Sequence, residues 1–209
     1  MHTVPASLAY AGAWGGSASN TSMGHRSIRR ACGPVCACAF LALAAPLGRI
    51  EAEAPIADEY PVKAAFLFNF AKFVEWPPDA FKSPEDPIGI CVLGQNPFGS
   101  ALEDVVRNKI VANRAFLVRE IANSQQASKC HIVFVTASER KRFRSLLEEL
   151  KGRSILTVGE TDDFISNGGV INFKLKDARV RIEIDAGAAE RAKLHISSKL
   201  LSLAEIVKR

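Results

Sequence analysis

The stretch IGICVLGQNPFG, residues 88–99, contains the pattern that decides the fold. Its first seven residues form an apolar run that ends at Gly94, which is typical of a short, fully buried strand. Asn96 and Pro97 then provide a cap and a first-turn residue, which predicts a helix that continues to about residue 108. A buried strand followed by a helix is the repeating unit of an α/β fold.

The same unit recurs along the chain. Apolar runs predict further strands at residues 115–119, 131–136 and 154–159, and a charged helix is predicted at residues 138–150. Near-continuous apolar strands that alternate with helices are buried on both sides. The sequence therefore predicts a mostly parallel sheet covered by helices on both faces.

An aromatic segment at residues 59–75 precedes the first strand. Phe66, Phe70 and Phe73 recur at the spacing of one helix face, and the prolines that follow Trp76 end the predicted helix. A helix that is apolar nearly all round usually packs under a sheet, so we expect these rings to lie in the core. The alternative is a groove that receives a partner.

The C-terminal part breaks the alternation of strands and helices. Two apolar segments, residues 170–175 and 179–185, are separated by only three residues, so they must pair as an antiparallel hairpin. In the second segment apolar residues alternate with charged ones, among them Arg181 and Glu183. One face therefore belongs to the core and the other is open to solvent or to a partner. A final amphipathic helix, capped by a serine, is predicted over residues 198–207.

The first 54 residues predict a leader. Residues 1–22 are small and polar, and the methionine that follows begins a basic segment, a short apolar run and a stretch of small residues, which together form the pattern of a signal peptide. We interpret residues 1–22 as an over-extended start and the signal peptide as residues 23–44 or 23–54. The apolar run is too short to span a membrane. A single α/β domain is then expected over residues 55–209.

Cleavage would change both the charge and the cysteine content. Of 27 basic and 22 acidic residues, 23 and 20 remain after residue 54, so the net charge falls from +5 to +3. This charge is too small to indicate a nucleic-acid partner, and export also argues against one. Cys91 and Cys130 are the two cysteines that remain. In an oxidising compartment a disulfide between them is favoured over two free thiols.

The residue types offer little for catalysis. The sequence contains no nucleophile elbow, phosphate-binding loop or dinucleotide-binding fingerprint. A metal site needs three or four ligands, whereas His131 and His195 belong to different predicted elements. We expect His131 to lie at the rim of a strand and His195 to be solvated. The sequence thus predicts no enzyme, no cofactor and no metal.

The loop from Gly94 through Asn96 to Gly99 is the nearest approach to a ligand site. It joins a strand to the start of a predicted helix, where backbone N–H groups can hold an anion or a small polar ligand. On this basis a periplasmic receptor for a small ligand is the alternative function. The simpler alternative for the loop itself is a tight turn with glycine at both ends.

Three stretches of the sequence resemble the YfiR/HmsC-like family of periplasmic proteins. They are EYPVKAAFLFNFAKFVEWP near the start, the strand IGICVLG, and GGVINFKLKDARVRIEID with AKLHISSKLLSLAEIV near the end. The resemblance covers about residues 58–207. It implies a non-catalytic repressor that binds the periplasmic domain of an inner-membrane diguanylate cyclase and so lowers cyclic-di-GMP signalling and biofilm formation. It leaves open whether the protein forms a homodimer.

The resemblance also implies roles for particular residues. Cys91 and Cys130 match a structural disulfide of the family, whereas a second disulfide found in some members has no counterpart here. The segments that contain Ile171 and Glu183 match the part of the family thought to meet the partner. Arg181 lies on the same predicted exposed face as Glu183 and is a further candidate for partner contact.

Overall fold

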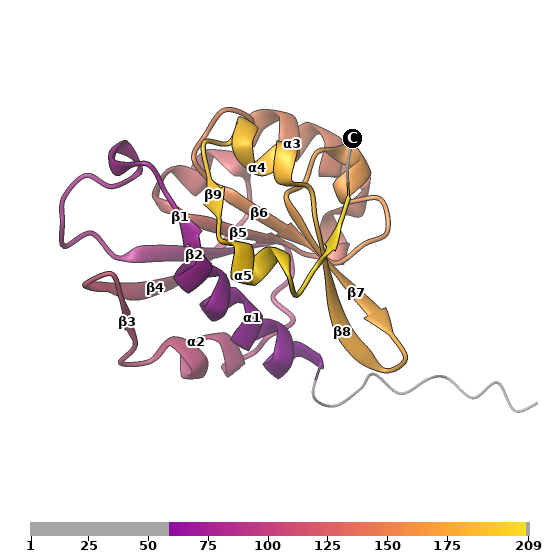
Figure 1. Cartoon of the computed structure of the whole chain (residues 1–209), viewed down its shortest axis with the longest axis horizontal. Helices are drawn as coiled ribbons and strands as arrows, with labels where there is room; N and C mark the ends of the chain where they lie inside the picture. Colours follow the sequence, from indigo (N-terminus) through magenta and orange to yellow (C-terminus); the bar gives the residue numbers. More distant parts are fainter. Residues whose placement is uncertain (1–58, 208–209) are drawn as a thin grey trace, which may run out of the picture. The chain divides into compact units, whose positions relative to one another are not determined.

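A mostly parallel sheet of eight strands forms the centre of the structure (Figure 1). The computed structural model describes residues 59–207, so the predicted leader lies outside the described residues. Five strands form the middle of the sheet and pair in parallel in the order β4-β2-β5-β6-β7. They are β2 (Ile88–Leu93), β4 (Arg114–Ile121), β5 (Ile132–Val135), β6 (Leu156–Gly159) and β7 (Ile171–Lys176). The predicted fold class is confirmed.

Shorter or antiparallel strands extend the sheet at both ends. β8 (Arg179–Ile184) pairs antiparallel with β7, which confirms the predicted hairpin, and β10 (Glu205–Ile206) pairs in parallel with β8. At the opposite end, β3 (Ile110–Val111) pairs antiparallel with β4. A separate two-stranded sheet joins β1 (Val74–Glu75) to β9 (His195–Ile196).

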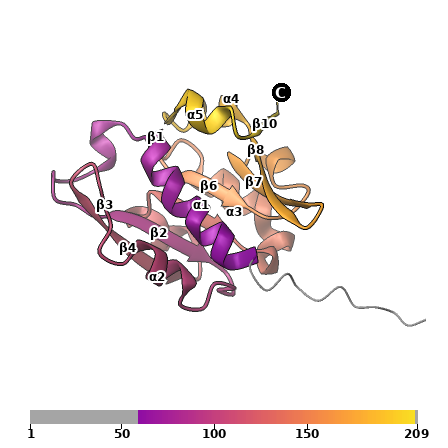
Figure 2. The ribbon, with the colours of Figure 1, turned by 60° about the horizontal axis from the view of Figure 1, so that its bottom comes forward.

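Helices cover both faces of the sheet, as the sequence predicts (Figure 2). One face of the sheet packs against α1, the longest helix, and the shorter helices α2 and α5 lie beside α1. The helix α3 covers the opposite face. The helices are α1 (Glu59–Phe73), α2 (Ala101–Val106), α3 (Phe143–Leu150), α4 (Ala186–Arg191) and α5 (Ser198–Leu201). Four 3-10 turns complete the connections: η1 (Pro78–Ala80), η2 (Ser124–Lys129), η3 (Ala137–Arg142) and η4 (Ile165–Asn167).

Each face of the sheet covers its own hydrophobic cluster. Under α1, the ring of Phe70 is fully buried and stacks on Phe173 of β7, with 5.8 Å between ring centroids. On the other face, Phe143 of α3 meets Phe164 edge to face, with 5.5 Å between centroids. The aromatic helix therefore packs on the sheet as predicted, because its rings fill the space between the helix and the strands.

The helix predicted to begin at Asn96 is shorter than expected. The side chain of Asn96 accepts a hydrogen bond from the backbone N–H of Phe98, at 2.9 Å, and so closes a local turn. α2 begins only after Ser100. Asparagine favours such turns as readily as it caps helices, so the prediction of a cap was wrong at this position.

The final predicted helix ends early as well. Ser197 caps α5 by accepting a hydrogen bond from the N–H of Leu200, but the helix ends at Leu201. The chain then returns to the sheet as β10, and the N–H of Val207 donates to the carbonyl oxygen of Ile184. Pairing with the open backbone groups of β8 outweighs the helical pattern of these residues.

Candidate partner-binding surface

The β7–β8 hairpin carries the three residues predicted to contact a partner. Its two strands project from the body of the sheet (Figure 1). Ile171 pairs with Ile184 in the hairpin, and both side chains are fully buried on the face that α1 covers. The side chain of Ile171 is therefore not exposed, and the predicted contact between its segment and a partner stays a prediction. The contribution of Ile171 is to anchor the base of the hairpin in the core.

Glu183 lies on the opposite face of the hairpin and belongs to an ionic cluster. The ammonium group of Lys174 lies 3.3 Å from a carboxylate oxygen of Glu183 and 3.3 Å from one of Asp162. Asn172 donates to the other oxygen of Glu183, at 3.4 Å. Partial burial disfavours the charged form of Lys174, but the hydrogen bonds and the charges of the two carboxylates outweigh it and raise the pKa of Lys174. The carboxylate of Glu183 is thus held in position by fixed neighbours.

Arg181 lies directly across the hairpin from Lys174 and is exposed. Lys176 and Arg179 form the next pair toward the tip of the hairpin and are exposed on the same face. Successive cross-strand pairs on one face of a hairpin lie close together. This face therefore presents a cluster of positive charge with Glu183 at its inner end.

A groove of about 670 Å³ runs between the hairpin and the segment that follows α5. Two leucines of its lining are exposed, Leu175 at 51% and Leu203 at 70%. Arg181 and Glu183 also line it. Exposed apolar side chains beside charged ones are typical of the centre and rim of a protein interface.

The sequence did not single out the leucines of this groove. Leu175 continues the core-facing alternation of β7, but the hairpin extends beyond the helix that covers its base, so the side chain is exposed. Leu203 was expected on the apolar side of a helix. It instead lies in the turn between α5 and β10. The exposure of Leu175 could not be predicted, because the sequence does not show how far the hairpin extends beyond the core.

The Gly94–Gly99 loop lies at the carboxyl end of β2, next to β5. In the order β4-β2-β5-β6-β7 the next strands along the chain lie on opposite sides of β2, β4 on one side and β5 on the other, and open α/β sheets commonly bind ligands at such a point. Gly94 has a φ of 101°. A Cβ at this position would lie 2.4 Å from the hydroxyl oxygen of Thr136 and 2.6 Å from that of Ser138, so only glycine fits between the two loops.

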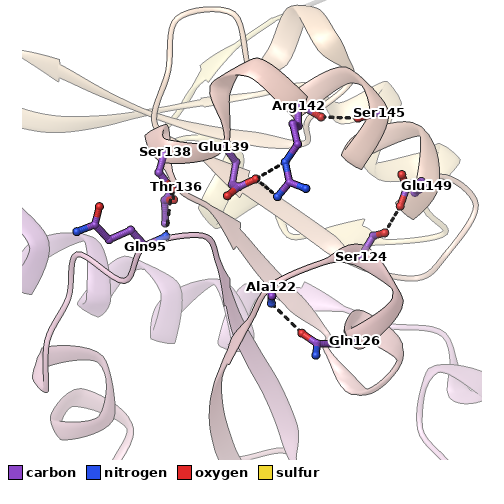
Figure 3. A network of polar contacts seen from close by, with 10 residues as sticks. All are labelled: Gln95, Ala122, Ser124, Gln126, Thr136, Ser138, Glu139, Arg142, Ser145 and Glu149. Atoms are coloured by element: carbon purple, nitrogen blue, oxygen red, sulfur yellow. Dashed lines mark hydrogen bonds and ion pairs between the residues drawn. The ribbon is translucent and has the colours of Figure 1, made fainter.

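The polar groups around this loop are already bonded within the protein. The N–H of Gln95 donates to the hydroxyl oxygen of Ser138, at 3.1 Å (Figure 3). The N–H of Ala137 donates to a carboxylate oxygen of Glu160, at 3.1 Å, and the buried ammonium of Lys63 lies 2.7 Å from the other oxygen. An internal ion pair occupies this edge of the sheet. The geometry favours the tight-turn alternative over ligand binding by Gly94, Asn96 and Gly99.

The predicted disulfide joins β2 to the residue that ends the η2 turn, two positions before β5 begins. β2 and β5 are neighbours, and the Cα atoms of Cys91 and Cys130 lie 5.8 Å apart with their sulfur atoms bonded. Both side chains are buried beneath the layer that contains α3. The disulfide therefore closes the crossover from β2 through β4 to β5.

His131 is buried rather than placed at a rim, which corrects the prediction. Its Nδ1 accepts from the N–H of Gly89, at 3.0 Å, and its Nε2 donates to the carbonyl oxygen of Ala80, at 3.2 Å. The ring of Phe81 stacks on it with 4.2 Å between centroids. Trp76 donates to its carbonyl oxygen, at 3.2 Å. The loop after α1 covers the imidazole and holds it neutral, with both ring nitrogens bonded.

The titration of His131 predicts loss of stability in mild acid. Burial lowers the pKa of His131, and the positive charge of Arg114 adds to this, against opposing effects of Ala80 and Asp86. Between the ordinary value near 6.5 and the lower folded value, the unfolded chain therefore binds the proton and the folded chain does not. The free energy of unfolding should be constant above about pH 7 and fall as the pH decreases below about 6.5.

Urea unfolding of the wild type and of His131→Asn at pH 5.5 and 7.5 checks this. Asparagine keeps an acceptor for the N–H of Gly89 but does not titrate. We expect the variant to be less stable at both pH values and to show a smaller difference between them. An equal pH difference in the two proteins would show that another group is responsible.

The remaining chemistry of the described chain is limited. His195 is exposed on β9, as expected. Among residues 59–207, no three His, Cys, Asp or Glu side chains come together as metal ligands would. No helix within that range combines the length and the apolar character that crossing a membrane requires.

Comparison of the chain with models of known protein families identifies one matching family. A family model described as YfiR/HmsC-like matches residues 60–205. No curated protein matches the chain. Two solved structures show partial similarity: an ABC domain in complex with L-Trp from Streptococcus pneumonia, at 9% identity, and a conserved domain protein from Vibrio cholerae O1 biovar eltor, at 10%. Each has a TM-score of 0.48, and the matches cover 70% and 72% of this chain but 60% of each of those chains.

Proposed function

Because the chain belongs to the YfiR/HmsC-like family, we propose that it is a periplasmic repressor that binds the periplasmic domain of an inner-membrane diguanylate cyclase. Binding would lower cyclic-di-GMP signalling. Proteins of this family are regulators rather than enzymes. The family match over residues 60–205 is the observation that carries the proposal, and it spans nearly all of the described chain.

Two independent features support the proposed compartment. Residues 23–44 or 23–54 have the pattern of a signal peptide, which predicts export through the inner membrane. The Cys91–Cys130 disulfide suits an oxidising compartment, where such bonds form and persist. Both features support the periplasm as the place where the protein meets its partner.

We propose the hairpin groove as the surface that contacts the cyclase. Leu175 and Leu203 would enter the apolar centre of the interface, because they are the exposed leucines of the groove. Arg181 and the neighbouring cations of the hairpin would meet acidic side chains of the partner. Glu183, fixed by Lys174 and Asn172, would accept a hydrogen bond at the inner end of the groove.

Charge reversal at Arg181 tests this surface. We expect Arg181→Glu to weaken binding to the purified periplasmic domain of the cyclase at least about tenfold, because an acidic partner would then face a like charge. In cells the same variant should raise cyclic-di-GMP toward the level of a strain that lacks the protein. Biolayer interferometry and quantification of the nucleotide by mass spectrometry measure the two effects.

Lys109→Glu is the matched control. Lys109 is also exposed, and its replacement by glutamate changes the charge by the same amount as Arg181→Glu. Lys109 lies beside β3, at the opposite end of the sheet from the hairpin. We expect the affinity of Lys109→Glu for the periplasmic domain of the cyclase to stay within about twofold of the wild type. Equal losses in the two variants would contradict the hairpin surface. An unchanged cyclic-di-GMP level after deletion of the gene would contradict the repressor itself.

A further inference from the structure

A cavity of about 760 Å³ opens at the amino edge of the sheet, where β2, β4, β5 and β6 begin. Its walls are the loop between η1 and β2, the outer strand β4, the η2 turn and the residues that lead into β6. The partner groove lies at the carboxyl end of β7, because the hairpin turn follows that end. The cavity and the groove are therefore separate sites, and a ligand could occupy the cavity whether or not a partner binds the groove.

The lining of the cavity combines aliphatic side chains with positive charge. Leu117, which is exposed, contributes most of the aliphatic surface, and Ile155, which is 6% exposed, adds a small part of it. Four cations also line the cavity: Lys82, Arg119, Lys129 and Arg153. All four are exposed, and none of them forms an ion pair with a carboxylate of the described chain. Unpaired cations around one cavity raise its positive potential and attract an anion.

The acidic residues of the lining do not cancel this charge. Asp86 accepts hydrogen bonds from the backbone N–H groups of Lys82, at 2.6 Å, and Ser83, at 3.1 Å. Its carboxylate therefore closes the turn of its own loop. Asp79 is the second acidic residue of the lining, so four cations face two carboxylates. The balance of charge in the cavity remains positive.

The walls of the cavity are held by contacts that need no ligand. The guanidinium of Arg114 lies 3.7 Å from the ring centre of Phe81, whose other neighbour is the imidazole of His131. Arg114 also donates to the carbonyl oxygens of Ser83, at 2.9 Å, and Asp86, at 2.7 Å. These contacts fasten the loop that forms one wall. A cavity with fixed walls loses little conformational entropy when a ligand enters.

The opposite wall is fastened by the disulfide. Cys130 ends the η2 turn and is bonded to Cys91 of β2. Arg153 donates to the carbonyl oxygen of Ser124 at the start of the same turn, at 3.3 Å. Both walls are therefore tied to the sheet, so the backbone positions of the cations on them are fixed relative to one another.

We propose that this cavity binds a small organic anion with an aliphatic body, such as a medium-chain carboxylate. The aliphatic body lies against Leu117 and Ile155, and the anionic group is held by Arg119 and Lys129. The volume lies within the range that small-molecule sites occupy. A guanidinium can bind a carboxylate through two parallel hydrogen bonds, and the lysine adds a second positive charge.

Titration calorimetry of the purified protein with octanoate, octanamide and acetate tests the proposal. Octanoate carries both features of the ligand, octanamide lacks the charge, and acetate lacks the aliphatic body. We expect octanoate to bind with one-to-one stoichiometry, at least about tenfold more tightly than either of the others, and more weakly as salt is added. Equal binding of octanamide, or no binding of octanoate up to about 10 mM, would overturn the proposal.

A pair of double variants shows whether binding occurs in this cavity. Arg119→Gln with Lys129→Gln removes two lining cations, and we expect it to weaken octanoate binding at least about tenfold. Arg107→Gln with Lys109→Gln removes the same charge beside β3 and should leave binding within about twofold. All four residues are exposed, so both variants should keep the wild-type melting temperature to within a few degrees. Equal loss in the two variants would place the binding outside the cavity and reject it.

Discussion

Replacing Cys91 and Cys130 by serine is expected to lower the free energy of unfolding by about 4 kcal/mol. The two cysteines are separated by 39 residues in the sequence. The disulfide therefore restricts a long loop in the unfolded chain, and its loss restores that conformational freedom. Urea denaturation followed by circular dichroism measures the effect, with the variant and the wild type compared at the same pH.

Reduction of the wild type provides the control for this prediction. In dithiothreitol the wild-type free energy of unfolding should fall to within about 1 kcal/mol of the variant, because both then lack the same covalent link. Before reduction, peptide mapping of the alkylated protein should recover the two cysteine peptides as one linked species. Two separately alkylated peptides from unreduced protein would refute the disulfide. If the variant without the two cysteines has the same free energy of unfolding as the wild type, the disulfide does not stabilise the fold.

Gly89→Ala is expected to destabilise the protein by about 3 kcal/mol or more. A Cβ on Gly89 would lie 2.1 Å from the carbonyl oxygen of Lys129, which belongs to the backbone and cannot rotate away. The η2 turn that contains Lys129 would have to shift. That shift would pull on Cys130 and on the hydrogen bond between Gly89 and His131. One methyl group thus disturbs the disulfide crossover and the buried imidazole together.

Gly187→Ala is the control for the substitution of Gly89. A Cβ on Gly187 would lie 3.2 Å from the end of the Arg191 side chain, which is flexible, and 3.3 Å from a carboxylate oxygen of Asp185. Because Gly187 lies within α4, alanine also favours its backbone conformation. We expect its free energy of unfolding to stay within about 1 kcal/mol of the wild type. Thermal denaturation in which the two variants behave alike would show that the close approach at Gly89 is not restrictive.

Much of the sheet could be predicted because its signals are local. The runs that become β2, β5 and β6 are apolar over most of their length, since both of their faces are buried. The short connection between β7 and β8 left only an antiparallel pairing. The disulfide followed from the two cysteines that remain once the leader is set aside.

The errors concern residues whose environment comes from distant parts of the chain. His131 stands at the start of a strand, where a polar residue usually faces solvent, but the loop that contains Ala80 and Phe81 folds over it. Leu203 fits a helix by its spacing, but the chain leaves the helix to pair with β8. In each case a contact across many residues outweighed the local pattern.

The sequence by itself indicated the buried strands β2, β5 and β6, the helix that precedes them and the antiparallel hairpin, because apolar periodicity and connection length act between near neighbours. It favoured the bond between Cys91 and Cys130 through the cysteine content that remains after residue 54. The tertiary structure alone decided which apolar side chains near the hairpin stay exposed. The hairpin extends beyond the helix that covers its base, so Leu175 is exposed. Leu175 and Arg181 therefore line a groove together with Leu203. The exposure of a side chain on the hairpin depends on where the covering helix ends. The pattern of residues along one strand does not show where that helix ends.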